Sequence, residues 1–307
     1  MKEIIVKAPA TIANFGPGFD IFALALEEPY DELKVSLTGS NSISLTVSGR
    51  PIEIPTSVKE NSAGLAALRF FEQINFFQGV EIQIRKRMRI GSGLGSTGAS
   101  AAACVYALNK LFNANLEDNK IIEIASEGEI ASGGIAHADN VAACLLGGFI
   151  LVKNFNPLEV VRIDVPDIPI VMCIMKKALR TTRGRIAQSY SLVQIKEQMS
   201  YCANLIQALM RGDLKGIGEA VNKDHISEPA RATVISGYDE IKKKVLAAGA
   251  YGCNISGGGS SIFAICEEQK RTELGELMST HFRQRGVEHE IIITKASNTG
   301  IVEISKS

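Results

Sequence analysis

RKRMRIGSGLGSTGASAAA, residues 85–103, joins a short basic segment to glycines at positions 91, 93, 95 and 98 and then to a run of small residues typical of a helix. Glycine lets backbone N–H groups approach a ligand closely, and the N-terminus of a helix carries about half a positive charge. A phosphate group suits both features. The stretch therefore predicts a phosphate-binding loop that opens a helix, with a nucleotide as its ligand.

The same glycines also satisfy the dinucleotide pattern G-x-G-x-x-G over residues 93–98. In dinucleotide-binding proteins that pattern usually follows the first strand of a parallel unit, whereas a hairpin and a helix are predicted first here. The phosphate-loop pattern G-x-x-x-x-G-K followed by Ser or Thr does not occur in the chain. On the loop alone, a phosphate site and a glycine-rich helix entry that lets two elements pack tightly both remain open.

Alternating apolar and polar residues surround this loop on its N-terminal side. Residues 35–38 and 43–47 alternate on either side of a turn at Gly39, which predicts a hairpin in a half-buried sheet. Residues 80–84 alternate in the same way and predict the strand that enters the glycine loop. Helices are predicted over residues 62–77, over the small residues that follow the loop, and over residues 119–130.

Prolines and isolated acids over residues 154–169 predict a domain boundary, with one domain over residues 1–160 and a second over 161–307. The second domain is predicted to begin with a buried strand and to mix helices with strands. Its strands are expected over residues 170–175, 261–266 and 289–294, and its helices near 186–211, 213–223 and 234–248. This order of elements favours an α+β architecture.

Composition limits the partners of the chain. Its 307 residues contain 33 Lys plus Arg and 33 Asp plus Glu, so no net field attracts nucleic acid or an anionic membrane. The six cysteines are scattered and predict reduced, mostly buried thiols of a cytoplasmic protein. The longest apolar stretch, residues 141–152, is shorter than the roughly 20 residues a membrane helix needs. We expect a soluble protein with a small-molecule partner, no nucleic acid and no membrane.

Hydroxyl and carboxyl side chains near the glycines suit a phosphate with magnesium. Ser96 and Thr97 place hydroxyls in the first turn of the predicted helix, and Glu127 and Glu129 lie on the next helix. Magnesium prefers such oxygen ligands. Either acid could instead lie on a solvated helix face, but a polar glycine-containing segment, residues 132–140, directly follows Glu129.

Two further glycine-rich segments point to a family. Residues 8–20, APATIANFGPGFD, place Asn14 and Asp20 around a Gly-Pro-Gly turn, and residues 254–261 read NISGGGSS. With the central loop, these segments resemble the three motifs of the kinase superfamily of galactokinase, homoserine kinase, mevalonate kinase and phosphomevalonate kinase (GHMP kinases). The resemblance spans the chain. It implies a two-domain α+β fold with a ribosomal protein S5 domain 2-like N-terminal domain and a ferredoxin-like C-terminal domain.

The first motif is most similar to that of the homoserine kinases, because the sugar and mevalonate kinases tend to end it with a Gly-Glu-His-type sequence. Residues 28–31, 137–140 and 228–231 agree with that branch. The resemblance implies transfer of the γ-phosphoryl group of ATP to the hydroxyl of L-homoserine. The alternatives are a kinase of the same fold for another small alcohol, such as shikimate or mevalonate, and a non-catalytic nucleotide-binding regulator.

The resemblance also implies roles for the residues that would bind the acceptor. Asp20 pairs with the amino group of homoserine, Arg185 and Arg231 hold its carboxylate, and Asn14 and Asn140 orient the reacting end. Arginine suits a carboxylate because its planar guanidinium can donate two parallel hydrogen bonds.

For the nucleotide, the resemblance places Asn61 near the adenine and assigns Mg²⁺ to Thr97 and Glu129. Asn14, Asn140, Thr97 and Glu129 form the expected catalytic set. The residues expected around ATP are Asn61, Arg89, Ile90, Gly91, Ser92, Gly93, Leu94, Gly95, Ser96, Thr97 and Gly98.

The chain departs from the family pattern at four places. Arg89 stands where proline is common, Thr97 replaces a serine, and residues 256–260 read SGGGS where SGSGP is common. Residues 180–185 read RTTRGR, so Arg183 is an alternative to Arg185. No dedicated base is expected: the γ-phosphate would accept the hydroxyl proton, with Asp139 and His137 as loop-supporting groups. The family also suggests a homodimer.

Overall fold

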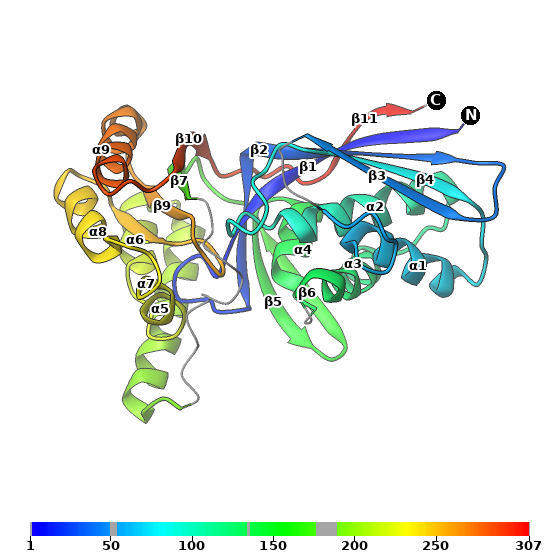
Figure 1. Ribbon diagram of the computed structural model, residues 1–307. Coiled ribbons are helices and arrows are strands. Elements are labelled where there is room, and N and C mark those ends of the chain that lie inside the picture. Colours follow the sequence, from blue (N-terminus) through cyan, green and yellow to red (C-terminus); the bar gives the residue numbers. More distant parts are fainter. Residues whose placement is uncertain (1, 50–53, 134–135, 176–188, 307) are drawn as a thin grey trace.

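Two β-sheets, each covered by helices, stand side by side (Figure 1). This computed structural model describes residues 2–49, 54–133, 136–175 and 189–306. Within them the first sheet has seven strands and the second has four. The predicted α+β class is confirmed.

The first sheet contains the strands that lead to the glycine loop. Its main path runs β11-β1-β2-β4-β3, and β5 pairs with β2 and β6 with β5. On β4 the side chains alternate in burial, so Val80, Ile82 and Ile84 face the core, followed on the same face by Lys86. The strand bounds are β1 (Glu3–Ala13), β2 (Phe22–Leu37), β3 (Ile43–Gly49), β4 (Val80–Lys86), β5 (Phe149–Phe155), β6 (Leu158–Ile163) and β11 (Val302–Lys306).

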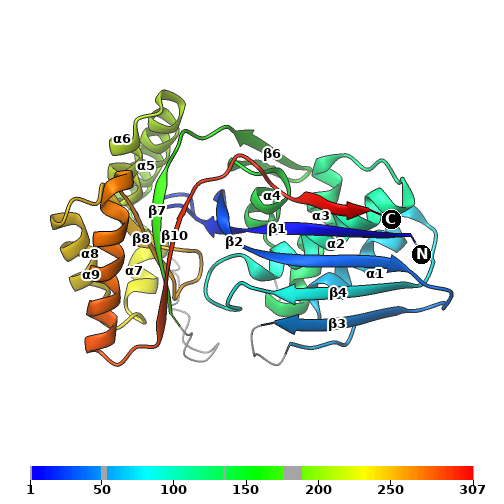
Figure 2. The same ribbon diagram turned by 90° about the horizontal axis from the view of Figure 1, so that it is seen from above.

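The predicted hairpin between residues 35–38 and 43–47 is wrong. β4 lies between β2 and β3, antiparallel to β2 and parallel to β3 (Figure 2). The loop after β2 wraps around the start of β4: Thr38 N donates to Gly79 O at 3.0 Å, and Val80 N donates to Ser42 O at 3.1 Å. The alternation marked both strands correctly, but it does not show which strand lies beside which.

Four helices cover one face of this sheet (Figure 1). They are α1 (Ser62–Ile74), α2 (Ser96–Phe112), α3 (Asp118–Gly133) and α4 (Ala138–Leu146). α2 is central, since it packs on β1, β2 and the other three helices. The small residues Ala101, Ala102 and Ala103 at its start are fully buried and allow this close packing. The predicted helix over 62–77 ends earlier, where Asn75 adopts a left-handed φ of 49°.

The second sheet is antiparallel in the order β10-β7-β9-β8. α8 and α9 cover one of its faces, and α5 and α6 lie toward the core shared with the first sheet. The bounds are β7 (Pro169–Met175), β8 (Gly252–Ile255), β9 (Ile262–Ile265), β10 (His289–Lys295), α5 (Leu192–Arg211), α6 (Leu214–Val221), α7 (Ser227–Ala232), α8 (Tyr238–Ala247), the short 3₁₀ helix η2 (Glu268–Lys270) and α9 (Arg271–Gln284).

The two sheets share one apolar core. The ring of Phe15, in the turn after β1, stacks on Phe263 of β9 with centroids 5.5 Å apart and meets Phe149 of β5 edge-on at 6.0 Å. The chain then returns to the first sheet, because β11 pairs with β1 beside the N-terminus. The division at residue 160 remains a prediction. No helix in the described ranges is long and apolar enough to cross a membrane.

Candidate active site

The three glycine-rich segments meet around one cavity of ≈ 410 Å³. Backbone hydrogen bonds join them: Thr11 N donates to Leu94 O at 3.1 Å, and Gly257 N donates to Ala13 O at 3.2 Å. The third segment also binds the central loop directly, because Ser261 N donates to Ser92 O at 2.9 Å. Segments about 80 and 160 residues apart along the chain therefore form one wall.

Two loop positions require glycine. Gly93 has φ +92° and Gly95 has φ +68°, a conformation that side chains rarely adopt. A Cβ on Gly93 would lie 2.2 Å from the carbonyl oxygen of Ser256, and one on Gly95 would lie 2.0 Å from Thr11 Oγ1. The loop can approach both neighbouring segments only without side chains here.

α2 begins at the cavity. Gly95 is its N-cap and provides no side-chain hydrogen bond, so the first-turn N–H groups keep the positive end of the helix available to an anion. Ile90, Gly91, Gly93 and Leu94 line the cavity beside this end, as do Ser96 and Thr97. The arrangement suits a phosphate chain. It supports the phosphate interpretation that the glycines alone left open.

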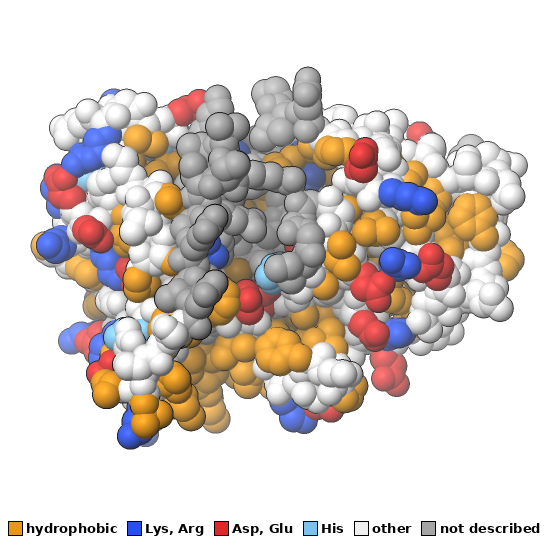
Figure 3. Space-filling model, turned by 60° about the horizontal axis from the view of Figure 1, so that its bottom comes forward, with side chains coloured by type: hydrophobic (Ala, Val, Ile, Leu, Met, Phe, Trp, Pro, Cys, Tyr) orange, Lys and Arg blue, Asp and Glu red, His pale blue; other side chains and the backbone are white. Residues whose placement is uncertain are grey.

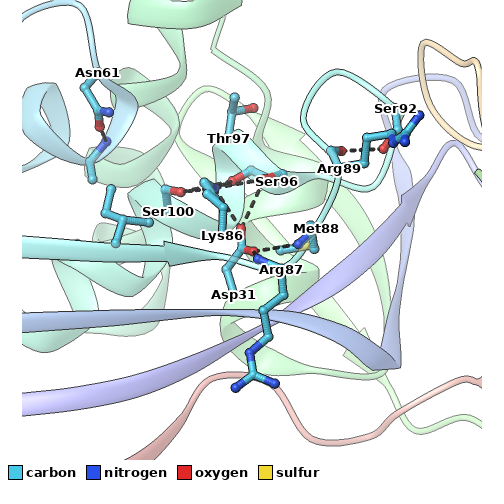
Figure 4. Close-up of polar contacts among 12 residues, drawn as sticks. Asp31, Asn61, Lys86, Arg87, Met88, Arg89, Ser92, Ser96, Thr97 and Ser100 are labelled. Atoms are coloured by element: carbon cyan, nitrogen blue, oxygen red, sulfur yellow. Dashed lines mark hydrogen bonds and ion pairs between the residues drawn. The ribbon is translucent and has the colours of Figure 1, made fainter. Parts of the chain in front are cut away.

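A buried ion pair lies beneath the loop (Figure 4). Lys86 Nζ lies 2.7 Å from Asp31 Oδ2, and the two side chains are 4% and 2% exposed. The ammonium also donates to Ser96 O and Ser96 Oγ, both at 2.8 Å, and to Ser100 Oγ at 2.5 Å. Asp31 Oδ1 accepts from the backbone N–H groups of Arg87 and Met88. One pair thus fixes both the strand that enters the loop and the helix that leaves it.

Thr97 and Glu129 suit a magnesium ion. Thr97 Oγ1 donates to Glu129 Oε1 at 3.1 Å, and both residues line the cavity. No group of three or more His, Cys, Asp or Glu side chains in the described ranges could hold a metal ion. Mg²⁺ is commonly held by one or two protein oxygens together with substrate phosphates and water. The two side chains fit that mode of binding.

The cavity is also lined by side chains of opposite charge. Asp20 and Arg231 both line it, and His137 Nδ1 lies 3.6 Å from Asp20 Oδ1. Burial raises the pKa of Asp20, while His137 and Arg231 oppose that shift. Asn14 is 4% exposed; its Oδ1 accepts from Asp20 N at 3.1 Å, and its Nδ2 donates to Ser227 Oγ at 2.9 Å. These side chains can bind a small molecule that carries both a cationic and an anionic group.

Asn140 and Asp139, at the start of α4, also line the cavity. Asn140 Oδ1 accepts from Thr11 Oγ1 at 2.6 Å, which leaves its amide NH₂ for a ligand. Asp139 is 2% exposed and its Oδ1 accepts from Asn140 N at 2.8 Å. Burial, which is the largest cause, and the nearby charge of Asp20 raise the pKa of Asp139 to about 6, against the opposing effects of the hydrogen bond from Asn140 N and of His137.

Most of the residues predicted for the site line this cavity, and a few do not. Those that line it are Asn14, Asp20, Ile90, Gly91, Gly93, Leu94, Gly95, Ser96, Thr97, Glu129, Asn140 and Arg231. Gly98, in the first turn of α2, lies behind this surface, where a Cβ would be 3.0 Å from Glu129 Oε1. Arg185, and its alternative Arg183, lie outside the described residues.

Three other predicted residues have structural contacts elsewhere. Asn61 is the N-cap of α1: its Oδ1 accepts from Ala63 N at 3.0 Å and its Nδ2 donates to Pro55 O at 2.9 Å. The Arg89 guanidinium pairs with Glu288 at 2.7 Å, and Ser92 Oγ donates to Arg89 O at 2.6 Å. The roles proposed for them toward ATP remain predictions.

Sequence reasoning missed Lys86 and Asp31. The alternation in the sequence contains the signal. Lys86 falls on the same face of β4 as the buried residues 80, 82 and 84, and Asp31 falls on the same face of β2 as the buried Leu33 and Val35. A charge on the inward face of a strand must find a partner. Two opposite charges on neighbouring inward faces predict an ion pair.

Comparison with known proteins supports the class that this fold and cavity define, a kinase that phosphorylates a small molecule. The family model for the GHMP kinases N terminal domain matches residues 60–148, and the model for the GHMP kinases C terminal matches residues 205–288. The chain belongs to the GHMP kinase family, and curated relatives similar to it are homoserine kinases.

Three relatives show the extent of the similarity. The homoserine kinase of Methanococcus maripaludis is 39% identical over 88% of this chain and 89% of its own length, and that of Pyrococcus abyssi is 36% identical over 94% and 96%. The crystal structure of homoserine kinase from Cytophaga hutchinsonii has a TM-score of 0.92 at 35% identity, covering 99% of this chain and 98% of that one. L. major mevalonate kinase, at 16% identity and a TM-score of 0.72, shares the fold.

Proposed function

We propose that this chain is a homoserine kinase, which transfers the γ-phosphoryl group of ATP to the hydroxyl of L-homoserine to give O-phospho-L-homoserine and ADP. The observation that carries the proposal is that one cavity is lined both by groups suited to phosphate and by groups suited to an amino acid. The glycine loop and the start of α2 form its phosphate end, and Asn14, Asp20, Asn140 and Arg231 form its acceptor end. Figure 3 shows a hollow between the two halves of the molecule, with acidic and histidine side chains in it.

The acceptor end complements a zwitterionic amino acid. The carboxylate of Asp20 would pair with the amino group of homoserine and the Arg231 guanidinium with its carboxylate, since each carries the opposite charge. The amides of Asn14 and Asn140 would orient the hydroxyl toward the phosphate end. Shikimate and mevalonate each carry a carboxylate for Arg231 but no amino group, so neither offers a cation to the partly buried Asp20 carboxylate. This argues for an amino acid over shikimate or mevalonate.

Phosphoryl transfer depends mainly on positioning and on charge stabilisation. The backbone N–H groups of the loop and the N-terminus of α2 would hold the phosphates in place. Thr97 and Glu129 would hold Mg²⁺, which neutralises charge on the phosphates when it is bound. Among the residues that the structure describes, the side chains that line the cavity include no Lys. Asp139 hydrogen-bonds its own neighbour, so we assign it to supporting Asn140 and assign the hydroxyl proton to the γ-phosphate.

A coupled assay of ADP release tests the proposal. The purified protein is given ATP and Mg²⁺ with L-homoserine, shikimate, mevalonate or no acceptor, and the product is identified by mass spectrometry. We expect turnover with homoserine to exceed that with either other alcohol by at least about a hundredfold, because only homoserine pairs both charges. Turnover of mevalonate or shikimate alone would overturn the substrate assignment. ATP binding without turnover of any acceptor would favour the non-catalytic regulator.

We further propose a homodimer, on the basis of the family resemblance. Apolar side chains on α5 support a protein contact there, since Leu192, Val193 and Met199 are 66%, 63% and 68% exposed. Light scattering coupled to size-exclusion chromatography measures the mass directly. A mass near 33.0 kDa at micromolar concentration would show a monomer.

A further inference from the structure

We propose that Gln198 and Asp224 are positioning residues for the acceptor amino acid, which hold the Asp20 turn and the Arg231 helix at the separation that homoserine requires. This inference rests on the proposed function, since it concerns the same acceptor end. Neither residue lines the cavity. They would act through the backbone that carries the residues touching the substrate.

Gln198 is a buried polar side chain on an otherwise exposed part of α5. It is 7% exposed, whereas Glu197 and Met199 beside it face solvent. Its amide Nε2 donates to Pro17 O at 2.6 Å and to Asp224 Oδ1 at 3.0 Å, and its Oε1 accepts from His225 N at 2.8 Å. A buried amide with this many partners fixes the groups around it in one geometry.

Each of these contacts leads to a segment of the acceptor end. Pro17 lies in the Gly-Pro-Gly turn between Asn14 and Asp20. Asp224 precedes α7, the helix that carries Arg231. Gln198 therefore joins the turn with the acidic group to the helix with the basic group, although α5 itself contributes no side chain to the cavity.

Asp224 fixes the start of α7. Its carboxylate accepts from the backbone N–H groups of Ile226 at 2.8 Å, Ser227 at 3.0 Å and Glu228 at 2.7 Å. These are the groups that a helix start leaves without intrahelical partners, and the negative charge also suits that end of the helix. Ser227 in turn accepts from Asn14 Nδ2, a second tie between α7 and the turn.

A zwitterion sets the spacing that this network must maintain. The amino and carboxylate groups of an α-amino acid share one carbon, so Asp20 and Arg231 must converge on adjacent groups of a small molecule. A displacement of about 1 Å between the turn and α7 weakens both charge-assisted contacts together. The nucleotide contacts the other end of the cavity, so the effect should appear in the KM for homoserine and not in that for ATP.

The test compares Gln198→Met with Gln207→Met on the same helix. Methionine keeps the volume of glutamine and removes its hydrogen bonds, and Gln207 is exposed. For Gln198→Met we expect the KM for homoserine to rise about tenfold, equivalent to about 1.4 kcal/mol. The KM for ATP should stay within about twofold and kcat at saturating homoserine within about threefold. Gln207→Met should match the wild-type protein in all three.

Asp224→Asn provides the second variant and carries the test if Gln198→Met does not fold. It should also raise the KM for homoserine selectively, because one capping oxygen becomes a donor. In the double variant the rise in KM should be smaller than the product of the two single rises, because the two residues share one hydrogen bond. A fully multiplicative combination would show that the two residues act separately.

The outcomes separate this inference from the proposed function. A wild-type protein that does not phosphorylate homoserine overturns the function, and the inference with it. An active wild-type protein with an unchanged homoserine KM in both single variants overturns the inference alone. Equal changes in the KM values for homoserine and ATP, together with a lower melting temperature, would show a merely structural role.

Discussion

Asp139 is a buried carboxyl group, and its burial disfavours the ionised form. It is 2% exposed, and the charge of Asp20 disfavours its ionised form whereas His137 favours it. Its hydrogen bond from Asn140 N fixes the first turn of α4. These contacts support the proposal that Asp139 holds Asn140 in place and does not transfer a proton.

The raised pKa of Asp139 predicts a dependence of stability on pH. Burial raises this pKa from 3.8 to about 6, so between these values the folded protein keeps a proton that the unfolded chain releases. The free energy of unfolding should therefore fall as pH rises through this window. The contribution is roughly 2 to 3 kcal/mol, and it should be absent from Asp139→Asn, which keeps the acceptor for Asn140 N.

Urea unfolding of the ligand-free protein at several pH values measures this contribution. The difference between wild-type and Asp139→Asn stabilities should change across the window and become constant above about pH 7. Glu276→Gln, which removes an exposed carboxylate from the middle of α9, is the control and should give a constant difference. A constant difference for Asp139→Asn as well would show that the carboxyl ionises in the folded protein as it does in the unfolded chain.

Single residues also show how far the sequence could be interpreted. Asn14, Asp20 and Arg231 could be proposed because they stand in motifs, and the cavity brings them together. Gln198 belongs to no motif, and its role depends on a contact with Pro17, 181 residues away. Local patterns carry no information on such contacts, so residues that act through the backbone of distant segments had to come from the structure.

At the scale of elements, the pair of Lys86 and Asp31 joins β2, the end of β4 and the first turn of α2. Both charged groups are buried away from water, so the stability of each charge depends on the other group and on the surrounding hydrogen bonds. The groups around them include the Ser96 hydroxyl, which also donates to Asp31 Oδ2 at 3.1 Å. This hydroxyl is thus engaged beneath the loop, whereas the Thr97 hydroxyl is directed to Glu129.

Removal of one partner should be more costly than removal of both charges. Lys86→Met leaves the Asp31 carboxylate buried and unpaired, so we expect a loss of about 3 to 5 kcal/mol in the free energy of unfolding. Lys86→Met combined with Asp31→Asn removes the uncompensated charge and should cost less than the single change. Where Lys86→Met folds, its KM for ATP should rise, because the pair holds both ends of the loop.

The ion pair of Lys34 with Glu3, on the same sheet, is a matched control. Its side chains are 30% and 25% exposed, so Lys34→Met should cost clearly less than Lys86→Met and leave the KM for ATP unchanged. Urea unfolding and initial-rate kinetics on the four proteins provide both measurements. Equal costs for Lys86→Met and Lys34→Met would contradict the role given to the buried pair.

The false hairpin shows why element order could be predicted better than pairing. The strands over residues 43–47 and 80–84 were both identified, since alternation depends only on which face is buried. Pairing depends on α1, which connects β3 to β4 and returns the chain parallel to β3. The loop before β3 must then cross the width of β4, and a short glycine-containing sequence does not distinguish this path from a tight turn.

At the scale of the whole molecule, the chain does not divide simply into an N-terminal and a C-terminal half. β11 belongs to the first sheet although it lies at the end of the chain, and it pairs with β1 from Ile4 to Lys7. The cavity also takes residues from both sides of residue 160. The predicted division over residues 1–160 and 161–307 is therefore best tested by measuring whether the two parts unfold together.

We predict that both sheets unfold as one unit, because the apolar core continues from one sheet to the inner face of the other through Phe15 and Phe263. Hydrogen exchange measured by mass spectrometry at increasing urea should give β2 and β7 the same highest free energy of opening, within about 1 kcal/mol. Phe263→Leu should lower both values equally, because the lost ring contact stabilises the joint core. A drop confined to β7, with β2 unchanged, would instead establish two independently stable domains, and the active site would then lie between bodies free to open without unfolding.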